Sequence, residues 1–365
     1  MKGKVMSTLL AFGMAVSMFA GCGADNKAKV DGTADKNTNA GELAFVIGAE
    51  AIGDNSLNES VWEGIKKYGE EKKVSYQYYQ ASETEEEAFE EAIEKAIEDG
   101  AKVVVCQGDS FEIPVYRMQT SYPDVKFILM DGQPNDGEIY ETAENTMTVS
   151  YQEEQAGFLA GYAAVKDGYT SLGFIGGNEC PAVVRYGFGY LAGAEYAAQE
   201  MDVDVMVTYT YAGTSDASLE AEATASGWYN AGIEVIFTCG GAVLDSVVAA
   251  AEANSGKVIG EGVEPANKSE VVISHAMKMF SDTAYTAVSS VYDGTFAGGE
   301  TMVFDITNDG VGLAMENAQW TSFTQNDYEM VCTKLAAGEI TFANDTDKDV
   351  TDLVFSRVMV NYVQQ

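Results

Sequence analysis

Short apolar runs alternate along the chain with longer stretches whose apolar positions recur every three or four residues. Leu43–Gly48 is apolar throughout and ends at a glycine, as expected of a strand that helices cover on both faces. Thr84–Asp99 is an acidic amphipathic stretch followed by Gly100 as a stop signal, so we predict a helix there. Strands separated by helices of this length form βαβ units and a parallel sheet.

Apolar runs and helical periodicity also predict the remaining strands and helices. Further strands are expected at Val74–Gln80, Lys102–Gln107, Val125–Asp131, Ser171–Gly177, Val205–Tyr211, Glu234–Cys239, Lys257–Gly262 and Glu270–Ser274. Further helices are expected at Asn58–Lys73, Ile113–Ser121, Gln152–Val165, after Pro181, at Ala217–Ala231, up to Asn254 and at Asn326–Ala337. The alternation begins again near Thr146, and the chain is expected to return to its first half through Asp282–Tyr292 and Met302–Ile306.

This repetition predicts an α/β protein with two doubly wound, Rossmann-like lobes joined by a hinge. The N-lobe is expected to comprise residues 42–149 plus about 276–310, and the C-lobe residues 150–275 plus about 311–365. Some 320 residues are too many for one ordinary core and suit two domains. Ligands bind α/β sheets at the carboxyl ends of the strands, so the predicted ligand site lies in a cleft between the lobes.

Turns rich in glycine, aspartate and asparagine follow the predicted strands at these ends. They are Gly48–Asn55, Gln107–Ser110, Gly176–Glu179, Gly240–Gly241 and Gly260–Glu264. We include Gly240 among the candidate ligand-binding residues for this reason.

The N-terminus has the layout of a secretory signal: Lys2 and Lys4, an apolar stretch to about Ala20, and then small residues before Cys22. The cysteine after Ala-Gly resembles the bacterial lipoprotein box, which implies cleavage after residue 21 and a diacylglycerol on Cys22. An ordinary secretory signal and a membrane-spanning anchor are the alternatives, but the apolar run is shorter than the ~20 residues of a spanning helix. Residues 22–41 are small and polar and are expected to form a flexible tether. The mature protein is therefore expected on the extracytoplasmic face of the cell membrane, held by its lipid.

Charge and composition exclude several classes of function. The formal net charge is −36, and nucleic-acid binding needs a cationic face. Only three arginines occur, so a site that clamps phosphates or dicarboxylates is not expected and the ligand is expected to be neutral. Cys106 and Cys239 end apolar runs as buried thiols, and no Cys-x-x-Cys pair occurs. With His275 as the sole histidine, neither a zinc site nor serine hydrolysis is expected, so we predict no metal, no cofactor and no enzymatic activity.

Asp54-Asn55-Ser56-Leu57-Asn58 lies just beyond the first strand and opens a helix. Its simplest interpretation is an N-cap, since Ser56 or Asn58 can accept from first-turn amides. Asp54 and Asn58 also offer donors and acceptors that can bind the edge of a polar heterocycle.

Several motifs in order along the chain resemble the basic membrane protein family. These are substrate-binding lipoproteins of the purine nucleoside receptor type, which serve ABC importers and have the periplasmic binding protein type I fold. The similar segments are Asp54–Gly64, Tyr122–Phe127, Asp131-Gly132, Glu153–Gly161, Gly173–Gly177 and Asp309–Ala314.

The resemblance implies roles for individual residues. Asp54 and Asn58 match the positions that hydrogen-bond the base, Tyr186 matches an aromatic residue that stacks on it, and Lys278 matches a lysine near the sugar. The alternatives are a tyrosine packed between the lobes and a solvated lysine at a strand end.

Two positions depart from the family pattern. Leu57 replaces a phenylalanine, which removes one stacking face unless Phe111 or Trp62 supplies it. Gly262-Val263-Glu264-Pro265 stands where the family has a sugar-binding Asp-x-Asp-Gln; Glu264 can still accept from two ribose hydroxyls, but Pro265 removes an amide donor and the glutamine side chain.

The sequence therefore favours a monomeric, lipid-anchored receptor that captures a nucleoside, expected to be a purine nucleoside, and presents it to an ABC permease. Binding of a sugar or another small polar metabolite on the same fold is the second hypothesis, which the departures at Leu57 and Glu264 permit. An extracellular enzyme, and a sensor that signals occupancy to a membrane kinase, are the remaining alternatives.

Overall fold

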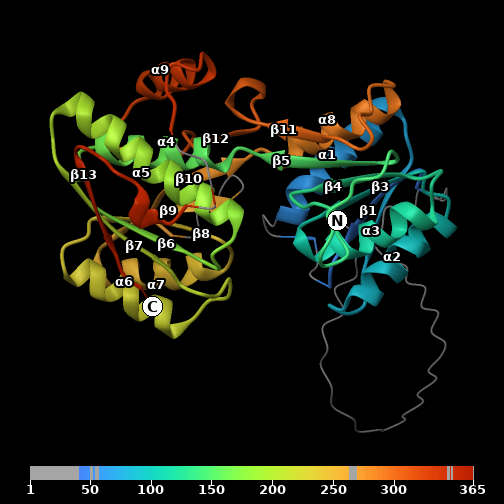
Figure 1. Ribbon diagram of the computed structural model, residues 1–365, viewed down its shortest axis with the longest axis horizontal. Helices are drawn as coiled ribbons and strands as arrows, with labels where there is room; N and C mark the ends of the chain where they lie inside the picture. The colour runs from blue at the N-terminus through green and yellow to red at the C-terminus, as the bar shows by residue number, and fades with distance from the viewer. Residues whose placement is uncertain are drawn as a thin grey trace, which may run out of the picture. The chain divides into compact units, whose positions relative to one another are not determined.

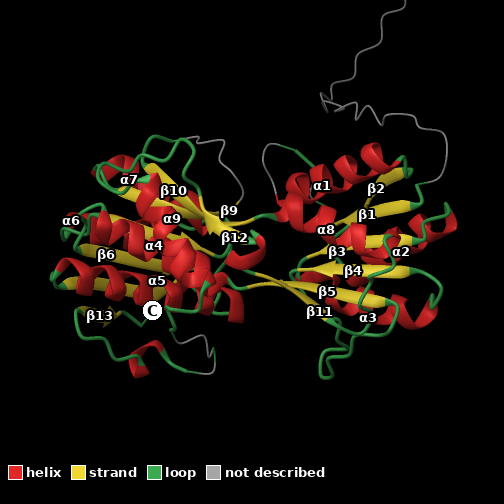
Figure 2. Ribbon diagram, turned by 90° about the horizontal axis from the view of Figure 1, so that it is seen from above, coloured by secondary structure: helices red, strands yellow, loops and turns green. Residues whose placement is uncertain are grey.

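The computed structural model describes residues 41–49, 52–53, 57–262, 269–342, 346 and 348–364. The described residues from 41 onward group as one compact unit. This unit contains two sheets, each covered by helices on both faces (Figures 1 and 2). The predicted α/β fold with mainly parallel sheets is confirmed. Cys22 and the predicted signal peptide lie outside the described residues.

The first sheet is built mainly from the N-terminal part of the chain. Its strands are β1 (Leu43–Ile47), β2 (Tyr76–Gln80), β3 (Val103–Gln107), β4 (Lys126–Met130), β5 (Thr146–Tyr151) and β11 (Thr301–Phe304). They are all parallel, in the order β11-β5-β4-β3-β1-β2. The associated helices are α1 (Leu57–Lys72), α2 (Glu86–Glu98), the short 3₁₀ helix η1 (Asp109–Phe111), α3 (Glu112–Ser121) and α8 (Phe280–Tyr292). The orange α8 and β11 lie among the blue and green elements of this sheet (Figure 1).

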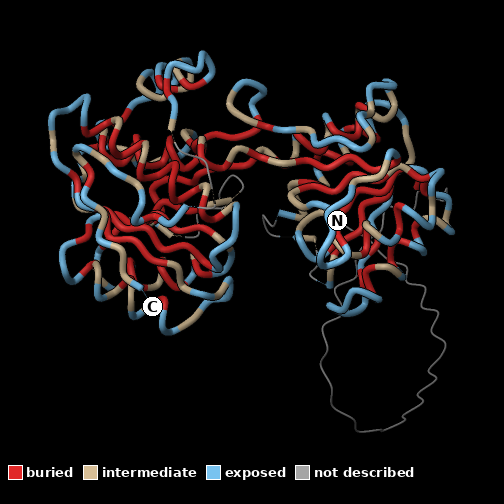
Figure 3. Tube along the Cα trace, viewed as in Figure 1, coloured by how far each residue is buried: buried red, intermediate tan, exposed pale blue. Residues whose placement is uncertain are grey.

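Alternate residues of the central strands face opposite helical layers. Phe45 and Val105 pack toward α1 and α8, whereas Val46 and Cys106 pack toward α2 and α3. Both faces are apolar because both are covered, which is why these strands are continuous hydrophobic runs (Figure 3). Cys106 is fully buried, as predicted.

The second sheet repeats this topology. Its strands are β6 (Ser171–Gly176), β7 (Val205–Tyr211), β8 (Val235–Cys239), β9 (Lys257–Gly262), β10 (Val272–Lys278), β12 (Val311–Leu313) and β13 (Val358–Tyr362). The order is β12-β10-β9-β8-β6-β7-β13, with only β12 antiparallel among these pairings. In the first sheet β1 lies between β2 and β3, and in the second sheet β6 lies between β7 and β8. The strand order therefore reverses between β1 and β3 and between β6 and β8, and these are the topological switch points of the two sheets.

The helices of the second half also form two layers. They are α4 (Glu153–Lys166), α5 (Pro181–Met201), α6 (Leu219–Asn230), α7 (Val243–Asn254) and α9 (Gln325–Ala336), with the 3₁₀ helices η2 (Ile306–Asn308) and η3 (Val350–Asp352). Phe174 and Phe237 pack toward α4 and α5, and Ile236 and Val258 toward α6 and α7.

Glycines bring α4 and α5 into backbone contact. A Cβ atom on Gly193 would lie 2.0 Å from the carbonyl oxygen of Phe158, and one on Gly161 would lie 2.0 Å from that of Tyr190. Gly157 and Gly189 make equivalent contacts across the same pair of helices. The two helices can approach this closely only because glycine has no side chain at the crossing.

Three features differ from the prediction. β10 runs from Val272 to Lys278 rather than over Glu270–Ser274, so residues 276–278, expected in the N-lobe, belong to the second sheet. Likewise Ser150 and Tyr151, expected in the C-lobe, are in β5 of the first sheet. The strands β12 and β13 were not predicted; β12 falls within the Gly-Val-Gly-Leu-Ala segment and β13 near the C-terminus.

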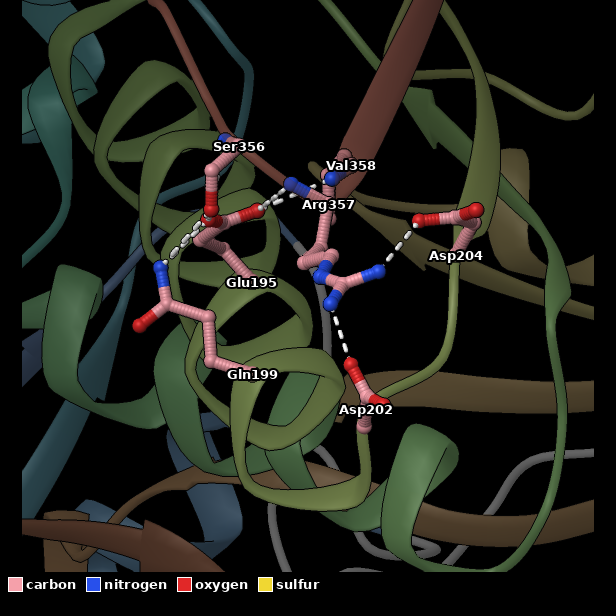
Figure 4. Close-up of polar contacts among 7 residues, drawn as sticks. All are labelled: Glu195, Gln199, Asp202, Asp204, Ser356, Arg357 and Val358. Carbon is pink, nitrogen blue, oxygen red and sulfur yellow. Dashed lines mark hydrogen bonds and ion pairs between the residues drawn. The ribbon is translucent and has the colours of Figure 1, made fainter.

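The carboxylate of Glu195 in α5 anchors β13. It accepts hydrogen bonds from the backbone amides of Ser356 (2.9 Å), Arg357 (2.9 Å) and Val358 (2.8 Å) (Figure 4). The Ser356 hydroxyl and the Gln199 side chain donate to it as well. The Arg357 side chain adds ion pairs with Asp202 and Asp204. This cluster fixes the start of β13 against the edge of β7.

Candidate functional site

A buried ion cluster lies where the chain passes between the two sheets. Lys278 is the last residue of β10, and its Nζ lies 3.0 and 2.9 Å from the two carboxylate oxygens of Asp131, which directly follows β4. The same Nζ lies 2.8 Å from Oε1 of Glu153, the first residue of α4. The Lys278 and Glu153 side chains are only 4% and 1% exposed. Lys278 is therefore not a solvated lysine at a strand end.

Glu153 also binds a second cation. Its Oε2 accepts a hydrogen bond of 2.6 Å from Nε of Arg185 in α5, and Glu154 lies 4.0 Å from the same nitrogen. Burial raises the pKa of Glu153, but Lys278 and Arg185 outweigh it and the pKa is lowered overall. Burial likewise lowers the pKa of Lys278, and Asp131 and Glu153 raise it well above its usual value. Glu153 and Lys278 are thus both charged at neutral pH.

The backbone amide of Gly240, at the carboxyl end of β8, is hydrogen-bonded to a carboxylate. It donates a 2.6 Å hydrogen bond to Oε2 of Glu261 in β9. Burial raises the pKa of Glu261, with Lys278 acting in the opposite direction. Gly240 has a φ of +94° and packs against Gly177, whose Cβ, if present, would lie 2.3 Å from the Gly240 carbonyl oxygen. Glycine is required at both positions by this close backbone contact and, at Gly240, by the positive φ.

Tyr186 is fully buried in α5 next to the ion cluster. Its ring packs edge-on against Phe237, with ring centroids 5.9 Å apart, and Nζ of Lys278 lies 5.9 Å from its centroid. Its hydroxyl has no hydrogen-bond partner among the described residues. A ligand can stack on this ring only after a rearrangement that exposes it.

The first-loop candidates are only partly described. Leu57 begins α1 and is 44% exposed, and Asn58 is half-buried beside it. Asp54 and Glu264 lie outside the described residues. Phe111 is buried against Phe89, with ring centroids 4.9 Å apart. Trp62 packs against Phe45, Tyr76 and Tyr78. Both aromatic rings that were considered as replacements for the missing phenylalanine are thus engaged in intramolecular packing.

Four of these polar residues, Asp131, Glu153, Arg185 and Glu261, were not among the predicted site residues. Asp131, Glu153 and Arg185 lie within the segments that resemble the family or adjoin the predicted Tyr186, and Glu261 lies in a strand-end turn. The sequence feature that could have indicated them is a charged residue at the end of an apolar strand or near the start of the following helix. Gln107, at the carboxyl end of β3, adds a buried side-chain oxygen without a partner among the described residues.

His275 lies in β10 and is buried, and burial lowers its pKa to about 4. It is therefore neutral at pH 7. In the described part of the chain, no group of three or more His, Cys, Asp or Glu side chains is placed to hold a metal ion. Cys239 is also buried, and burial raises the pKa of its thiol, which makes it a poor nucleophile.

A cavity of about 700 Å³ lies away from the ion cluster. It is lined by α4 and α5 residues, including Phe158 and Glu195, and by the segment leading to β13. None of the ion-cluster residues lines it.

None of the helices in the described part of the chain combines the length and apolar character needed to cross a membrane.

Comparison with known proteins identifies the kind of protein that this site belongs to. Residues 42–344 match the family model of PnrA-like ABC transporter substrate-binding proteins. The chain is 26% identical to the ABC transporter nucleoside-binding protein BmpA of Lactococcus lactis, over 93% of this chain and 99% of that protein. It is 25% identical to an uncharacterized lipoprotein of Pyrococcus abyssi, over 81% of this chain and 73% of that protein.

The fold is similar to that of solved solute-binding proteins. A solute-binding protein of an ABC transporter system from Aeropyrum pernix superposes with a TM-score of 0.67 at 21% identity, over 85% of this chain and 95% of that one. The type I periplasmic binding fold is thereby confirmed, as is the prediction that the chain is not an enzyme. Its partners are accordingly a small-molecule ligand and a transporter permease. From the match over residues 42–344, we conclude that the chain belongs to the family of PnrA-like ABC transporter substrate-binding proteins.

Proposed function

We propose that the protein captures nucleosides, purine nucleosides foremost, for an ABC importer, while a lipid on Cys22 holds it at the outer face of the cell membrane. The proposal rests on the similarity to a nucleoside-binding relative along nearly the whole chain. The ion cluster at the strand ends supports a neutral ligand, because both its cations, Lys278 and Arg185, are already paired with carboxylates. A phosphorylated ligand would have to displace one of these buried pairs.

Two lobes that close on the ligand would explain how binding is signalled to the permease. Ligand contacts made only in the closed state shift the population toward that state. In this proposal Asp54 and Asn58 hydrogen-bond the base, Tyr186 stacks on it after its ring becomes exposed, and Lys278 and Glu264 lie near the sugar. Gly240 and Leu57 complete the wall of the site.

Isothermal titration calorimetry of the purified protein tests the ligand. We expect inosine, guanosine or adenosine to bind with a Kd in the micromolar range or below, and free monosaccharides to bind far more weakly. Stacking of a base contributes about 1–3 kcal/mol, so Tyr186→Ala is expected to weaken binding by roughly 5- to 150-fold. Tyr186→Phe keeps the ring and serves as the matched control, with binding close to that of the wild type.

Absence of binding to every nucleoside at millimolar concentration would remove the nucleoside proposal and leave the family assignment. Tight binding of a monosaccharide, with Tyr186→Ala unaffected, would favour the sugar alternative. Leu57 is the observation in favour of that alternative, because an aliphatic side chain cannot supply a second stacking face.

The anchor is tested by membrane fractionation of cells that express the chain. The native protein is expected to pellet with membranes and to incorporate labelled fatty acid, because its mature N-terminus carries acyl chains. Cys22→Ala is expected to lose the label completely. Incorporation of equal label into Cys22→Ala would show that the acyl group is attached elsewhere, and a native protein without label would show that it is absent.

A further inference from the structure

Three segments connect the two sheets, and they are bonded to one another. We call them the crossovers: residues 151–153 between β5 and α4, residues 278–280 between β10 and α8, and residues 304–311 between β11 and β12. The Gln152 amide donates to the Phe304 carbonyl oxygen (2.9 Å), which joins the first crossover to the third. The Met279 amide donates to the Gly310 carbonyl oxygen (3.0 Å), which joins the second to the third.

The first and second crossovers are joined by charge. Glu153 and Lys278 are 2.8 Å apart, and both side chains are almost fully buried. The hydroxyls of Tyr151 and Thr283 add a buried hydrogen bond of 2.7 Å between the same two regions. Buried from water, the ion pair is screened little, so its two members constrain each other's position strongly.

Both carboxylate oxygens of Glu153 are bound to cations. One carboxylate oxygen faces Lys278 and the other accepts from Arg185 of α5, so two cations from different elements fix its orientation. Lys278 in turn reaches Asp131, at the end of a strand in the first sheet. A continuous series of ion pairs therefore extends from Arg185 in α5, through Glu153 of the first crossover and Lys278 of the second, to Asp131 at the first sheet.

We propose that Glu153 is a positioning residue: it holds the Lys278 ammonium in place for the ligand and couples ligand binding to the crossovers. The proposal rests on the proposed function, in which Lys278 lies near the bound sugar. Any ligand group that contacts Lys278 alters its pairing with Glu153, and this pairing connects two of the three segments about which the lobes would move. Glu153 itself does not touch the ligand.

The first measurement is the nucleoside affinity of Glu153→Gln by calorimetry, with the best ligand of the panel as the probe. The amide has the same shape but no charge, so it holds Lys278 and Arg185 less tightly. We expect Kd to rise about tenfold. Glu153→Asp keeps the charge and is expected to recover at least half of that loss on a logarithmic scale. Asp282→Asn, which neutralises an exposed carboxylate near the second crossover, is the control and is expected to change Kd less than twofold.

A double-mutant cycle then separates positioning from a purely structural role. If Glu153 acts through Lys278, adding Glu153→Gln to Lys278→Gln is expected to change Kd by less than twofold. A tenfold further loss in that background, or a Lys278→Gln variant that binds like the wild type, would overturn the proposal. If Lys278→Gln binds too weakly to titrate, the test is the Kd of Glu153→Asp. A Glu153→Asp protein that binds no more tightly than Glu153→Gln would contradict the proposal that the negative charge of Glu153 positions Lys278.

The results distinguish failure of the proposed nucleoside-binding function from failure of the positioning role of Glu153. A wild-type protein that binds no nucleoside contradicts the proposed function. A wild type that binds tightly while folded Glu153→Gln, checked by its thermal unfolding, binds equally well contradicts only the positioning role.

Discussion

Gly193→Ala is expected to destabilise the protein by roughly 3 kcal/mol or more, the upper end of the range for overpacked sites. The new Cβ would lie 2.0 Å from the carbonyl oxygen of Phe158 and 2.8 Å from the amide nitrogen of Tyr162. Both obstacles are backbone atoms of α4, so no side-chain rotation relieves the clash and the two helices must move apart. Chemical denaturation followed by circular dichroism measures the change.

Gly227→Ala in α6 is the matched control. Apart from its chain neighbours and the backbone of its own helix, no atom of the described residues lies within 4 Å of its Cβ position, so only the helix propensity changes. We expect this variant to gain about 0.5–1 kcal/mol, because alanine restricts the unfolded chain more than glycine does. A Gly193→Ala protein as stable as the wild type would show that the contact between α4 and α5 does not limit their packing.

Glu195→Gln is expected to lower the free energy of unfolding at pH 7 by roughly 2–3 kcal/mol, because hydrogen bonds to a charged acceptor are the strong ones. Glu195 accepts from three successive backbone amides of the segment that begins β13. A glutamine has one acceptor oxygen, and its NH₂ group faces donors. Buried amides therefore lose their partners, and we expect β13 to separate from β7 before the rest of the protein unfolds. Hydrogen exchange at Val358–Tyr362 detects this.

The same substitution changes the dependence of stability on pH. Burial raises the pKa of Glu195, but hydrogen bonds from Ser356, Arg357 and Gln199 outweigh it and bring the pKa from 4.5 to about 2. A carboxyl with a lowered pKa stabilises the fold above its unfolded pKa and loses that contribution as the pH falls through the folded value. The difference in stability between wild type and Glu195→Gln should thus shrink between pH 4.5 and 2.

Glu316→Gln, at an exposed loop carboxylate, is the control and should leave the free energy of unfolding at pH 7 unchanged. A constant difference between the wild type and Glu195→Gln from pH 7 down to 2 would mean that the charge of Glu195 contributes nothing.

The regular elements were predictable because their signals are local. The strand at Ser171–Gly176 is fully determined by an apolar run with a glycine at its end, and the long helix α5 by Pro181 at its first turn. β13 was missed because its sequence, Val358–Tyr362, is short and half exposed at the edge of the sheet. Its position depends on Glu195, more than 150 residues earlier in the chain.

The pairings of the polar residues around Lys278 could not be predicted from the sequence. Lys278 was selected because it matches a lysine of the family that the sequence resembles, and its buried ion pairs were not anticipated. Its partner Asp131 is 147 residues away, and no periodicity connects the two. The burial of Tyr186 could not be predicted either, because a tyrosine in an amphipathic helix suits both an exposed and a buried position.

The late position of β11 and β13 in the sequence has a consequence for biosynthesis. Each sheet receives one of its outermost strands only after most of the chain has left the ribosome: β11 beside β5 and β13 beside β7. Until then, β5 and β7 present unpaired backbone groups, which are templates for intermolecular pairing. A chain that lacks Val358–Tyr362 is therefore expected to leave the edge of β7 open to pairing with another chain.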